Sequence, residues 1–472
     1  MIRVSVASLV AGSLALAPLG CVRYQPSPLD PGAHVAEYRA RRLDDPSLRA
    51  WVTAHAGAPE GDRWTDAQLA VAALAFRADL ERGRRDWLAA RAGTAAAGAR
   101  PAPGAEVEVE RAVGGAEGDP PWVVSLAGLF TVELGGKQAA RLQAARAREA
   151  AAEAELALVL AGTLRRVRDA AMTLAHAEGA QRDAGAAVDA LRRVEDLERA
   201  RYAEAALGSG EVARTAADVA AARSDAAAAE RDAVLARADL AGTLAVPAAE
   251  VRALAVAPPT ADGCVWGEAI GADSLAAHAL VRRAEVARAL ASYAAAEAEV
   301  RARVAERYPD LALGPGFIWD QGVSRWTLAL ALPGLLALRA RGPVTAAEAA
   351  RHAAAARVAE APADIVAQTA RAVEGCRGAA HEVAVADSRR VAADRVAALS
   401  RAGYDRGETG RLELARAELL LTRAASATLA ARRRLERAGL ALEQAAAEWR
   451  GAGPVRWPDP RAEVFIPREE ER

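Results

Sequence analysis

The chain has 472 residues, of which 52% are hydrophobic but only 4% aromatic. Alanine, a strong helix former, accounts for much of that difference. Charged residues make up 26% and nearly cancel, to a formal net charge of −1 at pH 7. This balance argues against binding to nucleic acid or to anionic lipid through charge alone.

The N-terminus has the pattern of an export signal. Arg3 precedes an apolar stretch at residues 4–16 that is too short to span a bilayer as a helix. Small residues then lead to Cys21, as at a lipoprotein cleavage site, although Pro18 stands where a branched apolar residue is preferred. We expect residues 1–20 to be a signal peptide and Cys21 to carry lipid, with plain secretion as the alternative.

From residue 64 on, the sequence is an internal duplication of one unit, with a period of about 200 residues. Each copy predicts a helix, two strands, a very long helix, a turn and a returning helix. We assign residues 21–63 to an N-terminal lipid-anchored extension, 64–251 and 266–450 to the two repeats and 252–265 to a linker. Residues 451–472 are expected to be a C-terminal collar or a disordered tail.

Each repeat opens with a predicted helix, from Thr65 to about Ala97 and from Ser274 to about Arg307. Residues 98–103 and the Tyr308-Pro309-Asp310 segment should break these helices.

The strands that follow alternate with period two between large apolar residues and small or polar ones. The large apolar faces consist of Trp122, Val124, Leu126, Phe130 and Val132, then Leu311, Leu313, Phe317 and Trp319, then Trp326, Leu328, Leu330 and Leu332. Such a face meets a core in a soluble sheet and lipid in a membrane barrel. Four strands cannot close a barrel, and open edges are not tolerated in lipid. The strands therefore form a soluble sheet, or several chains share one barrel.

Glu106, Glu108 and Glu110 alternate with Val107 and Val109. In a shared barrel these carboxylates would face water in the lumen and form acidic rings that favour cations. The alternative is a solvated strand end with no effect on flux.

The next helices are exceptionally long, from Lys137 to about Ala206 and from Val344 to about Ala402. At a rise of ~1.5 Å per residue the first is on the order of 100 Å long. Returning helices are predicted from Glu211 to Thr243 and from Leu412 to Arg450. The last of these carries leucine and alanine at heptad spacing, which is typical of a coiled-coil seam.

Two cysteines remain besides Cys21. An exported protein could join Cys264 and Cys376, but Cys264 falls in the linker and Cys376 in a helix, so we interpret them as unpaired core residues. The sequence shows no nucleophile–base constellation, phosphate-binding glycine loop or metal-ligand spacing. We therefore expect no enzyme activity, no cofactor and no metal site.

The order of these features resembles the TolC-type outer-membrane efflux factors. The landmarks are Trp64, Trp266, Leu134-Gly135-Gly136-Lys137, Arg341-Gly342-Pro343 and Tyr404-Asp405-Arg406-Gly407. The resemblance implies a mainly α fold with a small membrane β part, in a homotrimer that shares a 12-strand barrel continuing into an α-helical periplasmic tunnel. It implies a passive duct in the outer membrane for small molecules or metal ions, supplied by an inner-membrane pump and a periplasmic adaptor. The alternative is a periplasmic coiled-coil scaffold or adaptor lipoprotein without a pore.

The resemblance also implies roles at the far end of the long helices. The turns there would dock the adaptor, through Gly208, Gly210, Tyr404, Gly407 and Gly410. The first turn reads as longer than the second and lacks the compact spacing from tyrosine to glycine. Acidic residues narrow the tunnel mouth in the family. Glu413 matches one such position and Arg416 replaces another, so we expect charge pairs to close the gate.

Overall fold

The computed structural model describes residues 24–111, 113, 121–257, 263–333, 341–448, 457, 459 and 461. The chain divides into two compact units, Met1–Arg41 and Arg42–Arg472. In the first unit, Asp30 caps helix α2 (Pro31–Ala40), none of whose residues is buried. The predicted signal peptide and Cys21 lie outside the described residues.

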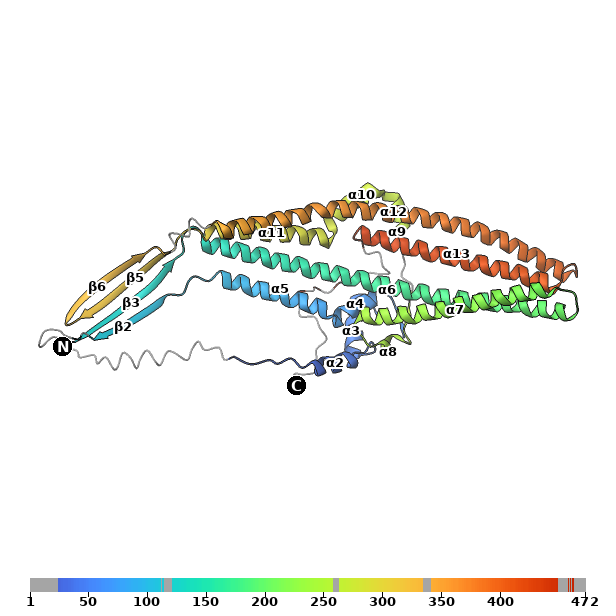
Figure 1. Cartoon of the computed structure of the whole chain (residues 1–472), viewed down its shortest axis with the longest axis horizontal. Helices are drawn as coiled ribbons and strands as arrows, with labels where there is room; N and C mark the ends of the chain where they lie inside the picture. Colours follow the sequence, from blue (N-terminus) through green and yellow to red (C-terminus); the bar gives the residue numbers. More distant parts are fainter. Residues whose placement is uncertain are drawn as a thin grey trace. The chain divides into compact units, whose positions relative to one another are not determined.

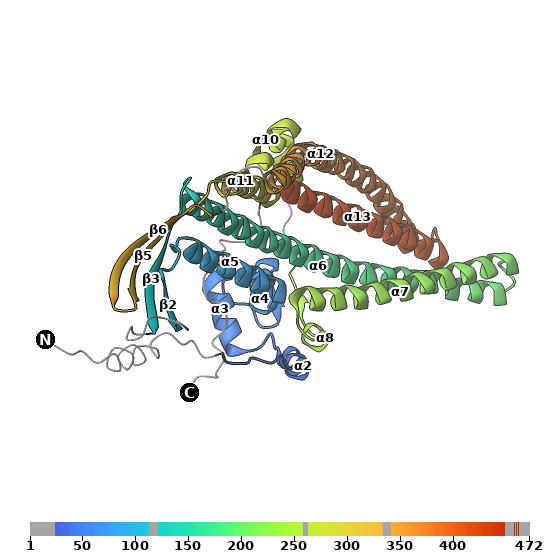
Figure 2. The same cartoon turned by 60° about the vertical axis from the view of Figure 1, so that its left-hand side comes forward.

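The second unit is mainly α with a small β part, as predicted (Figures 1 and 2). Its first half contains α3 (Pro46–Ala56), β1 (Arg63–Trp64), α4 (Asp66–Phe76), α5 (Ala78–Ala97), β2 (Gly104–Arg111), β3 (Trp122–Val132), α6 (Lys137–Ala203), α7 (Ser209–Leu244), α8 (Ala248–Val251) and β4 (Ala255–Val256). Its second half contains α9 (Gly263–Ile270), α10 (Ala272–Arg282), α11 (Ala284–Ala305), β5 (Leu311–Asp320), β6 (Val323–Ala331), α12 (Gly342–Asp405) and α13 (Arg411–Ala445).

The opening helix of each repeat is broken in two, where the sequence predicted one continuous helix. The break falls at Arg77, whose backbone is extended (φ −80°, ψ 116°), and at Arg283 (φ −71°, ψ 129°). Each arginine pairs with the acid two residues later, Arg77 with Asp79 at 2.6 Å and Arg283 with Glu285 at 3.5 Å. Neither break contains glycine or proline, so no helix-breaking residue marks its position in the sequence.

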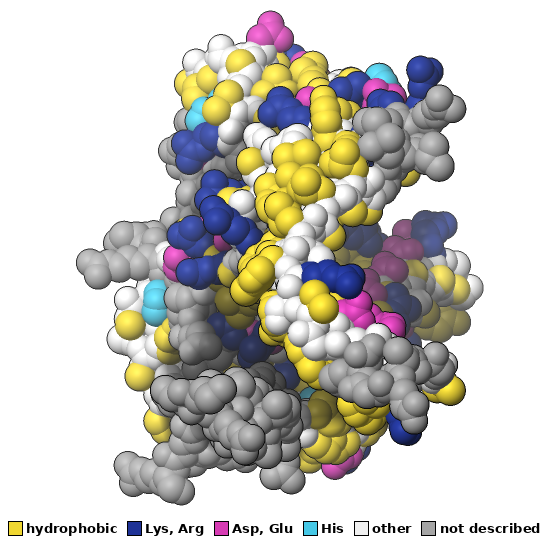
Figure 3. Space-filling view, turned by 90° about the vertical axis from the view of Figure 1, so that its left-hand side faces the viewer, with side chains coloured by type: hydrophobic (Ala, Val, Ile, Leu, Met, Phe, Trp, Pro, Cys, Tyr) yellow, Lys and Arg dark blue, Asp and Glu magenta, His cyan; other side chains and the backbone are white. Residues whose placement is uncertain are grey.

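Four strands form one antiparallel sheet in the order β2-β3-β5-β6. The register places Val107 beside Leu126, Leu126 beside Phe317 and Phe317 beside Trp326. Directly paired residues share a face, so the predicted apolar faces join into one. Along β6, Trp326 is 86% exposed and Leu330 64%. Hydrophobic side chains gather on this side of the molecule (Figure 3).

The two long helices each return along a shorter partner. α6 has 67 residues and α12 has 64, about 100 Å each by helical rise. α6 packs along α7 and α12 along α13 (Figure 1). On α13, the alanines of the predicted seam are buried at Ala417, Ala424, Ala431 and Ala445. The seam therefore lets the helix backbones approach closely.

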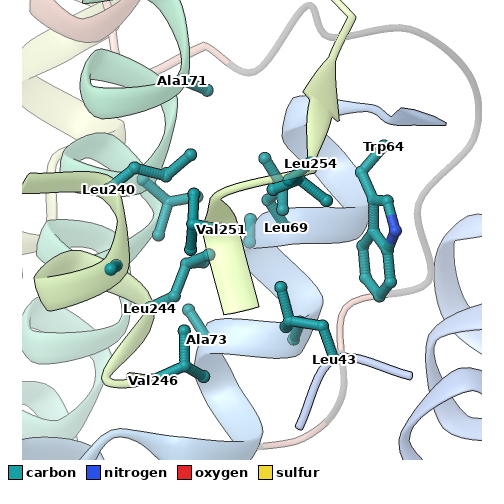
Figure 4. Packing of buried hydrophobic residues seen from close by; sticks show 14 of the residues in the cluster. Leu43, Trp64, Leu69, Ala73, Ala171, Leu240, Leu244, Val246, Val251 and Leu254 are labelled. Atoms are coloured by element: carbon teal, nitrogen blue, oxygen red, sulfur yellow. The ribbon is translucent and has the colours of Figure 1, made fainter. Parts of the chain in front are cut away.

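The two halves repeat the same core positions. When Tyr202 is aligned with Tyr404 and Arg77 with Arg283, every buried residue of the second core has a buried counterpart in the first. The pairs are Leu69 and Leu275, Ala171 and Val373, Leu174 and Cys376, Leu240 and Leu442, and Leu244 and Ala446. Figure 4 shows the first core, in which Trp64, Val246, Val251 and Leu254 add to these positions.

Cys264 and Cys376 form a disulfide, with a Cα–Cα distance of 5.3 Å. The prediction of two unpaired cysteines was wrong. Cys264 is not in a linker but on α9, which packs against both α12 and α13. This packing brings together two residues that are 112 apart in sequence.

Near the C-terminus, the chain contacts its first half again. Trp457 packs against Leu74, Leu80 and Leu156. Arg461 pairs with Glu153 of α6 at 2.9 Å. These contacts attach the segment that follows the second repeat to the first repeat.

Candidate functional site

The helical tip consists of two turns with the same backbone hydrogen bonds. The N–H groups of Ala205 and Gly407 each donate to the carbonyl of a tyrosine three residues earlier, Tyr202 and Tyr404, at 2.9 Å. The next N–H groups, of Ala206 and Glu408, donate to the carbonyls of Arg201 and Gly403 at 2.9 and 2.8 Å. This pair of bonds is the Schellman motif that ends many helices.

The two turns also have the same length, so the prediction of a longer first turn was wrong. Ala205 has φ +54° and Gly407 φ +74°. Gly208 and Gly410 then stand at equivalent N-caps, with extended backbones at φ −82° and −87°. The sequence did not show that the two turns are equivalent, because Ala205 stands where the second turn has Gly407 and alanine seldom adopts the left-handed conformation. Gly208 and Gly210 do not supply that conformation.

An ion pair joins the two hairpins just behind these turns. Arg416 of α13 donates through Nη2 to Oε1 of Glu198 on α6, at 2.7 Å. The side chain of Glu198 is only 2% exposed and that of Arg416 is 40% exposed. The hydrogen bond to Glu198 raises the pKa of Arg416 above its usual value, and the charge of Glu413 adds to this.

Glu413, the predicted gate residue, is exposed and forms no ion pair within the described residues. The structure therefore gives Arg416 a different direct partner from the one that the sequence suggested. Glu198 was missed because it lies 218 residues away. Other charged residues surround it in the sequence, so nothing local marks it as a partner of α13.

Apolar and close contacts also hold the two tips together. Leu191 and Val194 of α6 and Val219 of α7 pack with Leu412 and Leu419 of α13. The guanidinium of Arg201 lies so close to Gly410 that a Cβ there would be 2.5 Å from its Nη2. Arg201 of the first tip thus contacts the backbone of the second tip at Gly410.

Farther from the tip, polar contacts connect α6 to α13. His176 lies 2.8 Å from Glu436, and Asp183 pairs with Arg433. Nearer the core, Arg168 bonds to both Asp66 of α4 and Glu443 of α13. Those three side chains are at most 2% exposed. The sequence did not reveal this buried triad, because its members come from three separate helices.

Adjacent arginines of α6 bind the acids at both helix breaks. Arg166 contacts Asp79 at 3.0 Å and Arg165 contacts Glu285 at 2.9 Å. Burial alone would raise the pKa of Asp79, but its hydrogen bond to Arg77 and the charges of Arg77 and Arg166 outweigh that effect and lower it. The pKa of Glu285 is also lowered, because a backbone hydrogen bond and the charges of Arg165 and Arg283 outweigh burial.

Glu106, Glu108 and Glu110 are exposed on the sheet face opposite the apolar one. They pair with Ala127, Ser125 and Val123, respectively. At the β5–β6 turn, the same face carries Asp320 and Arg325, which pair at 3.1 Å.

The sheet joins the helices through a tight junction, whose contacts the sequence did not predict. Lys137, the sole lysine of the chain, starts α6 and contacts Asp310 just before β5 at 2.7 Å. Gly135 has φ +70°, and a Cβ there would lie 2.5 Å from the ring of Tyr308. Only glycine fits a left-handed backbone under that ring.

Among the described residues, no group of three or more His, Cys, Asp or Glu side chains is placed to hold a metal ion. No helix in that part of the chain is both long and apolar enough to cross a membrane.

Comparison with protein-family models and with curated protein sequences gave no match. Solved structures do match. VceC, an outer-membrane protein of Vibrio cholerae, has a TM-score of 0.63 at 20% identity, over 80% of this chain and 95% of VceC. The outer-membrane channel OprN has a TM-score of 0.64 at 20% identity, over 91% of this chain and 99% of OprN.

CusC, whose structures concern transmembrane channel formation, has a TM-score of 0.61 at 16% identity, over 92% of this chain and all of CusC. These likenesses cover most of this chain and nearly the full length of each neighbour. The chain has the fold of the TolC-type outer-membrane efflux channels.

Proposed function

We propose that the protein is the outer-membrane duct of a tripartite efflux system. In this role it passively exports small molecules or metal ions that an inner-membrane pump and a periplasmic adaptor deliver. The observation that carries the proposal is the four-stranded sheet, which has one continuous apolar face and is fused to helices about 100 Å long. A soluble protein would expose that face to water at high cost.

A shared barrel accounts for the two open edges of the sheet. Neighbouring strands alternate in direction, so the edge strands β2 and β6 run in opposite directions. The β6 edge of one copy can therefore pair antiparallel with the β2 edge of the next, and a ring of copies leaves no edge in lipid. In the proposed homotrimer, three copies give twelve strands.

The two faces of the sheet then have different environments. Trp326, Leu328 and Leu330 contact lipid. On the other face, Glu106, Glu108 and Glu110 of β2 line a water-filled lumen. In this arrangement the acidic rings favour cations over anions.

The other end of the long helices is proposed to bind the adaptor. The turns around Gly208, Gly210, Tyr404, Gly407 and Gly410 are the docking surface. Two equal turns support this proposal, because they present the same backbone shape twice in each chain. The ion pair of Arg416 with Glu198, together with Glu413 nearby, is the proposed gate.

The mature protein is proposed to begin at an acylated Cys21. The intact mass of protein isolated from membranes reports this directly. A free Cys21 thiol or cleavage at another position would exclude the anchor, but the barrel would remain, because the lipid only adds to a structure that already spans the membrane.

The assignment of the lipid face is tested with substitutions at alternate positions of β6. Leu328→Arg and Leu330→Arg should prevent barrel insertion, because a midplane charge facing lipid costs ~2–4 kcal/mol. The matched control is Ala329→Arg, on the opposite face between them. Heat-modifiable trimers in detergent extracts of outer membranes are the measurement.

We expect trimers from the Ala329 variant and none from the two leucine variants. Equal trimer yield from all three would contradict the lipid face. Release of the wild-type protein without detergent, once its anchor is cut, would favour a periplasmic scaffold or adaptor instead.

A further inference from the structure

The two repeats stabilise equivalent cores by different means. In the first, Leu174 and Leu244 occupy the positions that Cys376 and Ala446 hold in the second. The first core also receives Leu48 and Val52 from α3 and Trp64 from β1, all at most 1% exposed. At these two aligned positions the second core buries the smaller side chains of Cys376 and Ala446. They contribute less apolar stabilisation than the two leucines, because that term scales with buried area.

The disulfide lies at one of these two positions, because Cys376 replaces Leu174. Cys376 is 5% exposed and belongs to the cluster, and Cys264 packs against it. In the same cluster, Leu275 of α10 is fully buried against Val373 of α12 and Leu442 of α13. The bond therefore attaches α9 at the point where α9 and α10 cover the α12–α13 hairpin.

The position of the bond in the chain adds to its effect. It closes a loop that contains α10, α11, β5 and β6, because Cys264 precedes these elements and Cys376 follows them. In the chain-entropy model, a cross-link stabilises more as the loop that it closes becomes longer. This bond also fixes both ends of the segment that supplies two of the four strands.

We propose that Cys264 and Cys376 are a site of oxidative closure, at which a disulfide-bearing protein oxidant completes the second repeat. A thiolate of the pair attacks the disulfide of the oxidant and forms a mixed disulfide, which the second cysteine resolves. The Sγ–Sγ bond forms as the sulfur–sulfur bond of the oxidant breaks. Two electrons pass to the oxidant, and the two protons that the cysteines lose balance those its new thiols gain. The inference rests on the proposed export of the chain to an oxidising compartment.

The duplication predicts which side chain can replace the bond. A leucine at position 376 recreates the residue of the first repeat and restores apolar volume without a cross-link. The double variant Cys264→Ala/Cys376→Ala removes both the bond and the volume. Cys264→Ala/Cys376→Leu removes only the bond, and Leu174→Ala is the matched loss of volume in the first repeat.

Hydrogen exchange measured by mass spectrometry on the full-length protein from membranes tests the proposal. The double alanine variant should exchange faster in 263–282, by about tenfold or more, with 66–76 unchanged. Leucine at 376 should recover part of that protection, and Leu174→Ala should instead affect 66–76. Wild-type protein that has been reduced and alkylated should behave like the double alanine variant. If that variant does not fold, the reduced and alkylated protein replaces it in the measurement.

Free thiols at Cys264 and Cys376 in protein isolated from membranes would overturn the proposal. Unchanged exchange of 263–282 after loss of the bond would overturn it as well. Neither result depends on pore formation, which trimer migration in detergent reports separately. Failure of the disulfide and failure of the proposed function are therefore distinguishable.

Discussion

Ala205 and Gly407 occupy the same position in two copies of one turn, each three residues after a tyrosine and each with a left-handed backbone. A left-handed alanine is strained by roughly 1–2 kcal/mol. A Cβ at Gly407 would meet no atom within 4 Å, so conformation alone decides the effect of a substitution there.

Gly407→Ala should therefore destabilise the tip by about 1 kcal/mol. Gly208→Ala is the matched control, because it also has open space for a Cβ but its φ is −82°. Ala205→Gly should relieve strain and act in the opposite direction. Hydrogen exchange at residues 200–212 and 402–414 measures all three, and equal effects of the two alanine substitutions would contradict the conformational argument.

The pair of Arg416 and Glu198 predicts which charge holds the tips together. Arg416→Met should leave the buried Glu198 carboxylate without its cation and increase the open fraction of the channel in planar-bilayer recordings. Glu413→Gln, on the exposed side, should change it much less. If the Glu413 variant opens the channel and the Arg416 variant does not, the gate depends on Glu413, as expected from the sequence, and not on the pair of Arg416 with Glu198.

The acids at the helix breaks predict a loss of stability in acid. A carboxyl whose folded-state pKa is lowered stabilises the fold above its unfolded pKa, and that contribution disappears as pH falls through the folded pKa. Asp79 and Glu285 both have lowered pKa values. Wild-type protein should therefore lose thermal stability below about pH 4.

Asp79→Asn should lower the melting temperature at neutral pH and flatten this acid dependence. Asp86→Asn provides the comparison, because Asp86 is exposed and forms no ion pair in the described part of the chain. Equal pH profiles for wild type and Asp79→Asn would show that the Arg77–Asp79–Arg166 cluster does not stabilise the break.

The carboxylates of β2 predict the ion preference of the pore. Changing Glu106, Glu108 and Glu110 together to glutamine should reduce the cation-over-anion permeability ratio, measured by reversal potentials across a salt gradient. The triple aspartate variant keeps the charge and should keep the ratio. An unchanged ratio in the glutamine variant would leave these residues as a solvated strand end.

Local periodicity was sufficient to predict the sheet faces and the long helices. The alternation around Leu328 places every second side chain on one face, and the register confirms those faces across the sheet. The β5–β6 hairpin and the starts of α6 and α13 were predictable for the same reason. Each depends on neighbours within a few residues.

What the sequence could not show depends on contacts between distant residues. Arg77 and Arg283 stand at the helix breaks, where each forms an ion pair, and neither is a helix breaker by type. Glu198 becomes the partner of Arg416, and Cys264 that of Cys376, only when separate helices pack together. Ala205 concealed a turn that backbone hydrogen bonds make equal to its copy.

Electron cryomicroscopy of the full-length protein, extracted from outer membranes and held in lipid nanodiscs, tests the shared barrel most directly. A shared barrel predicts three copies around one axis, with β6 of each copy paired antiparallel to β2 of the next and the apolar face of the sheet toward lipid. A particle with one copy, or an assembly in which β2 and β6 remain unpaired edges, would contradict it.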